Sequence, residues 1–184
     1  MKRALILAAV LGLSACSTFY EQDTRTAKAE LNDTHLSMQV AGIVNKPPFQ
    51  GDTRINAVSY DGKLLLIGQA KTEALKNTLV QKIREVNGVE TIYDQIRIKP
   101  PLSLGAVSND TWLTTKVKSA LIGSKKLNNV NIKVITEDSE VFLLGYVTHE
   151  QANEATEIAR NIRGVKQVIK GFQYYQPQQT ETAQ

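Results

Sequence analysis

The sequence predicts an α+β fold built from two tandem copies of one small domain, each ordered helix-strand-strand-helix-strand. An internal repeat predicts the duplication, because Asn32-Asp33-Thr34-His35-Leu36 recurs 77 residues later as Asn109-Asp110-Thr111-Trp112-Leu113. In each copy, turn residues then separate two extended apolar runs, and an apolar helical period follows them. We therefore expect domains at residues 32–98 and 109–175, each with a three-stranded mixed sheet and two helices on one face.

The first helix of each domain is expected to begin at the repeated Asn-Asp-Thr, because these side chains favour helix N-caps. Pro47-Pro48 ends the helix in the first domain, and Gly123 ends it in the second. Apolar residues at helical spacing define the core-facing side in both copies. They are Leu36, Val40, Ile43 and Val44, and then Leu113, Val117, Ala120 and Leu121.

Two strands joined by a tight turn follow each first helix. The turns are Asp61-Gly62 and Asp138-Ser139, and such two-residue turns are typical of β-hairpins. The strands are expected at Ile55–Tyr60, Lys63–Gln69, Asn131–Glu137 and Glu140–Val147.

A second helix and a last strand complete each domain. The helices are expected at Thr72–Val86 and His149–Ile162, and the strands at Val89–Ile98 and Val165–Tyr174. A strand-helix-strand crossover favours parallel pairing of the second and third strands. Because each domain is small, we expect the two to pack on each other or on the N-terminal tether.

The N-terminus has the pattern of a secretory signal, with Lys2-Arg3 before a short apolar run and small residues before Cys16. Leu13-Ser14-Ala15-Cys16 resembles the bacterial lipobox, in which the cysteine carries diacylglycerol and, after cleavage, an N-acyl chain; an ordinary signal peptide with a chance cysteine is the alternative. The absence of aspartate at Ser17 resembles an outer-membrane address. The expected segments are a signal peptide at 1–15, a lipidated tether at 16–31, a linker at 99–108 and a disordered tail at 176–184.

The composition argues against several other classes of protein. One cysteine excludes an intramolecular disulfide, and the two histidines, His35 and His149, lie too far apart in sequence for a histidine-rich metal site. No Gly-x-Ser-x-Gly or phosphate-binding loop occurs, and Asp61 and Asp138 are explained as turn residues. Loss of Lys2 and Arg3 lowers the formal charge from +4 to +2, with 20 basic against 18 acidic residues. We expect no enzyme, no cofactor beyond the acyl chains and no nucleic-acid partner.

Trp112 is the most informative single side chain. It precedes Leu113 by one position and therefore points about 100° away from the core-facing side of its helix. An amphipathic tryptophan suits a membrane interface, and Lys116 lies one turn on. Further lysines follow at Lys118, Lys125, Lys126 and Lys133. A basic rim of this kind attracts anionic lipid, at about 1 kcal/mol per residue. Alternatively, Trp112 packs between the domains and the lysines form a solvated face.

The repeat resembles the BON domain, through its Asn-Asp-Thr start, Val141-Phe142-Leu143-Leu144-Gly145 and the Gly-Val after each second helix. The whole chain resembles dual-BON lipoproteins of the Gram-negative outer membrane. That resemblance implies a periplasmic face, binding of anionic phospholipids such as phosphatidylglycerol and cardiolipin, and support of outer-membrane integrity. It also implies enrichment at the division site, with β-barrel assembly machinery or amidase-activation partners. The implied lipid-binding residues are Trp112, Lys116, Asn109, Thr111, Thr115 and Ser119.

Two other functions remain open at this point. A protein adaptor would touch lipid only through its acyl chains. A binder of cell wall or small molecules is less favoured, because the sequence shows no aromatic-lined groove. Some BON proteins carry a haemolysin label, but the sequence contains no amphipathic pore-forming segment.

Overall fold

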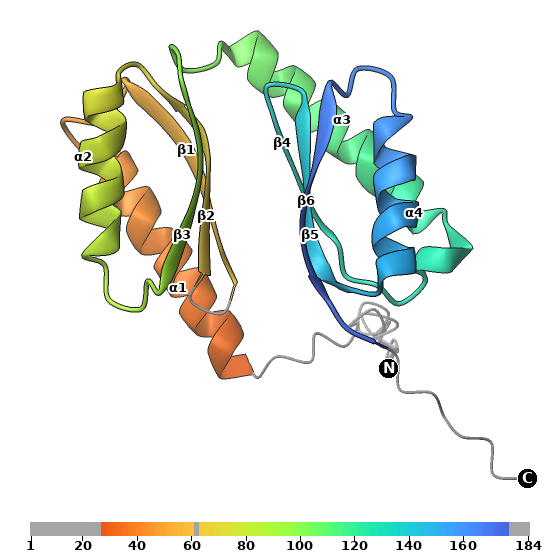
Figure 1. Ribbon diagram of the computed structural model, residues 1–184. Helices are drawn as coiled ribbons and strands as arrows, with labels where there is room; N and C mark the ends of the chain where they lie inside the picture. Colours follow the sequence, from red (N-terminus) through yellow and green to blue (C-terminus); the bar gives the residue numbers. More distant parts are fainter. Residues whose placement is uncertain (1–26, 61–62, 177–184) are drawn as a thin grey trace, which may run out of the picture.

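The computed structural model describes residues 27–60 and 63–176 (Figure 1). The first domain contains α1 (Ala27–Val44), β1 (Thr53–Tyr60), β2 (Lys63–Ala70), α2 (Glu73–Arg84) and β3 (Thr91–Ile98). The second contains α3 (Leu104–Ile122), the short 3-10 helix η1 (Lys125–Leu127), β4 (Lys133–Glu137), β5 (Glu140–Val147), α4 (His149–Arg160) and β6 (Gln167–Tyr174). The expected α+β class and the element order of both domains are confirmed.

Each domain has one three-stranded sheet of mixed direction, in the order β1-β2-β3 or β4-β5-β6. The hairpin strands pair antiparallel and the crossover strands pair parallel, as expected. Asp138 and Ser139 both have positive φ, 54° and 65°, which is the backbone of a type I′ hairpin turn. The equivalent turn at residues 61–62 lies outside the described residues.

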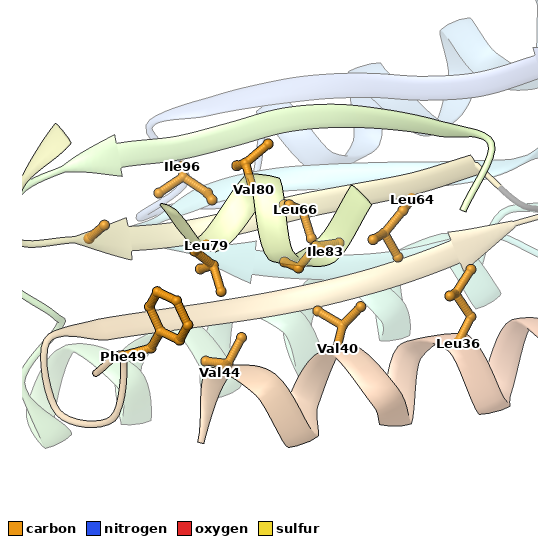
Figure 2. Packing of buried hydrophobic residues seen from close by; sticks show 11 residues of the cluster. Leu36, Val40, Val44, Phe49, Leu64, Leu66, Leu79, Val80, Ile83 and Ile96 are labelled. Carbon is orange, nitrogen blue, oxygen red and sulfur yellow. The ribbon is translucent and has the colours of Figure 1, made fainter. Parts of the chain in front are cut away.

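Each domain also has its own apolar core between its sheet and its two helices. In the first domain, Figure 2 shows Leu36, Val40 and Val44 of α1 directed toward β2 and α2. Phe49, in the loop after α1, lies at one end of this cluster and is 1% exposed. In the second domain, Val117 and Leu121 of α3 occupy the equivalent places.

The two sheets lie between the two pairs of helices, with their helix-free faces turned toward each other (Figure 1). Strand alternation places Ile67 of β2 and Phe142 of β5 on these helix-free faces. Both side chains are nonetheless buried, at 1% and 2% exposed, and both border one narrow gap between the domains. The domains therefore pack on each other through their sheets, as their small size predicts.

Polar groups close the end of this interface nearest the linker. Glu137 of β4 accepts hydrogen bonds from Asn56 Nδ2 and Gln69 Nε2, both 2.9 Å long, and it pairs with Arg54 at 3.4 Å. Beside it, Lys99 Nζ donates to Asp138. These contacts join the hairpin turn of the second domain to the sheet of the first.

The expectation that Asn-Asp-Thr caps the first helix of each domain is wrong. Ser103 is the N-cap of α3, since its hydroxyl accepts a hydrogen bond from the Ala106 N–H. Asp110 lies two turns into the helix, and its carboxylate accepts hydrogen bonds of 2.8 Å from the backbone N–H groups of Asp138 and Ser139. The aspartate at the repeated position thus joins helix to hairpin. In the first domain, Asp33 similarly accepts from the Ser59 hydroxyl at 2.6 Å.

Two expected segment boundaries change because the first helix of each domain begins earlier than expected. Residues 27–31 of the expected tether form the start of α1, because Ala-Lys-Ala-Glu-Leu consists of strong helix formers. Residues 104–108 of the expected linker belong to α3. The expected signal peptide, Cys16, most of the tether and tail residues 177–184 lie outside the described residues.

The outward face of helix α3 as candidate functional site

Helix α3 covers the second sheet with one side and leaves the other side open. Leu113, Val117 and Leu121 are buried against the sheet. Trp112 lies away from that side and is 60% exposed, so the alternative in which it packs between the domains is wrong. The helix thus holds its tryptophan at the surface on a rigid element.

Lys116 accompanies Trp112 on this face. Its ammonium lies 5.8 Å from the centre of the indole ring, within the range of a cation–π contact. The same ammonium donates a 2.9 Å hydrogen bond to the Arg163 carbonyl, beyond the end of α4. Lys116 therefore has a fixed position beside the ring, and its ammonium pairs with no carboxylate in the part of the chain that the structure describes.

The acidic side chain of α3 is turned inward. Asp110 is the one Asp or Glu in this helix, and it is 5% exposed. Both of its oxygens accept backbone hydrogen bonds from the hairpin turn. The outward face of α3 consequently presents positive charge and no carboxylate.

The other expected site residues are exposed, and the structure assigns their polar groups as follows. Thr111 and Thr115 donate their hydroxyl protons to the helix carbonyls of Val107 and Thr111, each at 3.0 Å, which leaves their lone pairs facing solvent. Asn109 donates to the Ser139 hydroxyl at 3.4 Å, close to the hairpin turn. Ser119 follows Trp112 by seven residues, so both lie on the same side of the helix.

The expected basic rim is only partly assembled. Lys118 is exposed on α3, and Lys125 and Lys126 lie in η1, where Lys126 pairs with Glu154 at 3.4 Å. Lys133 instead borders a hollow formed largely by α1 and β1 of the first domain. Nearness in sequence was a poor guide here, because the loop before β4 carries the chain away from Trp112.

The structure adds two apolar residues that the sequence reasoning missed. Leu104 and Ile122, at the two ends of α3, are 89% and 83% exposed. Both lie off the core-facing period, and this is the signal that could have revealed them. Together with Trp112 they give α3 exposed apolar side chains along its whole length. We call the side carrying Leu104, Trp112, Thr115, Lys116, Ser119 and Ile122 the α3 face.

The first domain provides an internal comparison. The positions of Trp112 and Lys116 correspond to His35 and Gln39, which bond to each other through Gln39 Nε2 and His35 Nδ1 at 2.8 Å. This helix therefore lacks both the indole and the cation. Although the folds are duplicated, the features of the α3 face belong to the second domain alone.

The structure contains an aromatic-lined groove that was not visible in the sequence. A cavity of about 360 Å³ opens between the two sheets, and aromatic rings from both domains line it. They are Tyr60, Tyr93 and Phe142, whereas the ring of Phe172, which also borders the cavity, packs against the core of its own domain. The sequence conceals this groove, because its walls come from strands of two different domains.

Among residues 27–60 and 63–176, no cluster of His, Cys, Asp and Glu side chains is arranged to hold a metal ion. None of the helices in this described part combines the length and hydropathy that a membrane crossing requires.

Comparison with known proteins identifies the class to which the chain belongs. The profile of the BON domain matches it twice, over residues 32–100 and 109–176. The chain belongs to the BON-domain family, as a dual-BON protein of the DolP type. It is 41% identical over 169 residues to the outer membrane lipoprotein DolP of Haemophilus influenzae, covering 91% of this chain and 88% of that protein.

Two further relatives are informative. A 21 kDa hemolysin of Actinobacillus pleuropneumoniae is 40% identical, covering 84% of this chain and 80% of the relative. The osmotically inducible protein Y of Escherichia coli is 33% identical over 45% of this chain and 43% of its own length. None of these names denotes an enzyme. The similarity to DolP supports the same broad class for this chain, an outer-membrane lipoprotein with BON domains.

Proposed function

We propose that this protein is anchored by acyl chains on Cys16 to the periplasmic face of the outer membrane and binds anionic phospholipid through the α3 face. The observation that carries the proposal is the pairing of a 60% exposed Trp112 with the Lys116 ammonium on a helix whose acid is buried. Indole rings favour the headgroup region, and cations favour anionic headgroups. Phosphatidylglycerol and cardiolipin are the proposed ligands.

The magnitudes are sufficient for reversible binding. Inserting Trp112 would remove roughly 100 Å² of apolar surface from water, which contributes about 2.5 kcal/mol. Lys116 and Lys118 add about 1 kcal/mol each near an anionic surface. Leu104 and Ile122 extend the apolar contact. These free energies are small beside the membrane affinity of two or more acyl chains. The acyl anchor would therefore keep the protein on the membrane, while the α3 face would select the lipid and orient the protein.

Sedimentation with vesicles tests this proposal. Residues 16–184 carrying Cys16→Ser, which lack acyl chains, are mixed with vesicles with and without phosphatidylglycerol, in low and high salt. We expect binding to anionic vesicles alone, weakened by salt, and at least about tenfold weaker for Trp112→Ala. His35→Ala, at the equivalent position of the first domain, is the matched control and should bind as the parent does. Equal binding by Trp112→Ala would refute the lipid site.

The alternative function is a protein adaptor for outer-membrane assembly or septal cell-wall cleavage. Exposed Leu31 and Met38 on α1, at 70% and 68%, favour a protein contact on the first domain. This adaptor would show no vesicle binding without the acyl chains and would retain an envelope protein after mild cross-linking.

We also propose enrichment at the division site and support of outer-membrane integrity, on the basis of the family resemblance. Loss of the protein should then increase detergent sensitivity, and a Trp112→Ala variant should fail to restore resistance if the α3 face is required. Uniform peripheral distribution of a fluorescent fusion would argue against the division-site role.

A further inference from the structure

The cavity between the two sheets is a site separate from the α3 face. Its volume is about 360 Å³, near the lower end of the roughly 300–1,000 Å³ typical of small-molecule sites. The strand registers place Val58, Leu65 and Tyr93 abreast on the helix-free face of the first sheet. Phe142 and Ile169 are paired on the facing side of the second sheet. Apolar side chains thus form both walls.

One end of this cavity adjoins the hydrogen-bonded joint between the domains, and the other adjoins the hairpin end of β1 and β2. Phe142 borders both the cavity and the narrow gap beside Gln69 and Glu137, where the two domains are joined by hydrogen bonds. Tyr60 and Lys63 line it from the hairpin end of β1 and β2. In the first sheet the lining runs from Lys63 to Gln95, which pairs with Ile67, so it spans four residues of β2, or roughly 13 Å at the usual strand rise. Lys63 therefore lies near one end of the lining and Phe142 near the other.

Among the described residues that line the cavity, Lys63 is the one cation on the cleft side of its strand. Lys63 alternates with Leu64 and shares the cleft side with Leu65, and it has no acidic partner among the described residues. The described residues that line the cavity include no aspartate or glutamate. Lys170 also borders the cavity, but it pairs in register with core-facing Leu143, so its side chain lies on the other face of β6. Charge complementarity therefore favours an occupant with one negative charge at the Lys63 end.

We propose that the cleft between the sheets binds one free long-chain fatty acid, with its carboxylate at Lys63 and its alkyl chain against Leu65, Leu144 and Ile169. A cavity of about 360 Å³ suits a ligand with one alkyl chain better than a phospholipid with two. The ligand and the surface both differ from those of the α3 face, and the two proposals stand or fall independently.

A fluorescence titration tests this site. The protein is residues 16–184 with Cys16→Ser, freed of bound lipid, and the probe is a polyene C18 fatty acid held below its micelle concentration. We expect saturable binding of one probe per chain. Palmitate should displace it, and palmityl alcohol, which has the chain without the charge, should compete at least tenfold more weakly.

Variants locate the binding in the cleft. Leu65→Trp fills the cavity from the first sheet and Leu144→Trp fills it from the second, so either should reduce affinity at least tenfold. Lys63→Glu should do the same, whereas Lys46→Glu, the same charge change in an exposed loop, should not. Trp112→Ala should bind the probe as the parent does. Circular dichroism confirms that each variant is folded.

Three results would overturn the proposal. They are the absence of saturable binding, parental affinity in both tryptophan variants, and loss of probe binding in Trp112→Ala with retention in Lys63→Glu. Tighter competition by lysophosphatidylglycerol than by palmitate would overturn the assignment of a free fatty acid.

Discussion

The carboxylate of Glu137 in the second domain accepts a 2.9 Å hydrogen bond from the side-chain amide of Gln69 in the first. Gln69 is 1% exposed and Glu137 is 4% exposed. The amide oxygen of Gln69 accepts a further hydrogen bond, 3.3 Å long, from the Leu102 N–H in the linker. One buried amide thus connects both sheets and the chain that joins them.

Glu137→Ala should loosen the joint between the domains. The substitution leaves Asn56 and Gln69 without their acceptor, while Arg54, which is 37% exposed, can be hydrated. We expect the free energy of unfolding to fall by about 1–3 kcal/mol and small-angle scattering to give a larger radius of gyration. Glu157→Ala removes an exposed pair with Arg160 and is the control, with an effect below about 0.5 kcal/mol. An unchanged scattering profile for Glu137→Ala would contradict this role.

Asp110 and Ser103 should have separable effects on stability. Asp110→Ala leaves two backbone N–H groups of the hairpin turn without their hydrogen-bond acceptor. It should lower the free energy of unfolding by roughly 2–4 kcal/mol. Ser103→Ala removes the helix cap and should cost about 1 kcal/mol. Asn109→Ala breaks one exposed hydrogen bond of 3.4 Å and should cost less than either. Urea denaturation of the three variants measures this order, and a loss for Asp110→Ala no larger than for Asn109→Ala would refute the helix-to-hairpin link.

The contact between Asp138 and Lys99 should depend on pH. A hydrogen bond from the Lys99 ammonium holds the pKa of Asp138 below its ordinary value, with help from Lys166 and against the opposing effect of burial. A lowered folded-state pKa adds stability that is present above the ordinary value of about 3.9 and is lost as the pH falls through the folded-state pKa. Because Asp138 is 36% exposed, the contribution should be below about 1 kcal/mol.

Lys99→Ala tests that dependence. The variant should be less stable than the parent at pH 7, and the difference should shrink once the pH drops below about 4. Thermal melts at several pH values measure it. A difference that stays constant down to pH 2 would mean that Lys99 stabilises the protein through packing of its stem instead.

Moving the tryptophan and the lysine of the α3 face onto α1 should give the first domain affinity for anionic vesicles. In a Trp112→Ala background, His35→Trp with Gln39→Lys places an indole and an ammonium one helical turn apart on α1, as on α3. We expect partial recovery of binding to anionic vesicles, by about threefold or more. Lys116→Gln, the converse change, should weaken binding by about 1 kcal/mol. No recovery would show that α3 needs its ends, Leu104 and Ile122, as well as the central pair.

The features that were predictable from the sequence depend on local interactions. The repeat, the helical periods and the turn at Asp138-Ser139 require neighbours within a few residues, and they predicted the element order and the parallel crossover. The helix starts were mispredicted, because the carboxylates of Asp33 and Asp110 bind partners 26 or more residues away. A local rule for caps cannot detect such a partner.

The site was predictable to the same extent. One turn of helix geometry placed Trp112 beside Lys116, and the structure confirms that contact. The cleft could not be predicted from either domain alone, because its two walls come from different domains. Its signal in the sequence was the pair of unbroken apolar runs Leu64–Ile67 and Val141–Leu144. Runs of this kind indicate strands covered on both faces. The sequence alone did not show which surface covers the second face.

Trp112 is the only tryptophan in the chain, so its own fluorescence reports directly on the central claim. Residues 16–184 with Cys16→Ser are titrated with phosphatidylglycerol vesicles, with neutral vesicles as the comparison. The account predicts a blue shift of emission and protection from an aqueous quencher with anionic vesicles alone, both reversed by high salt. Emission that stays unchanged while the protein sediments with those vesicles would contradict it, because the membrane contact would then lie away from the α3 face.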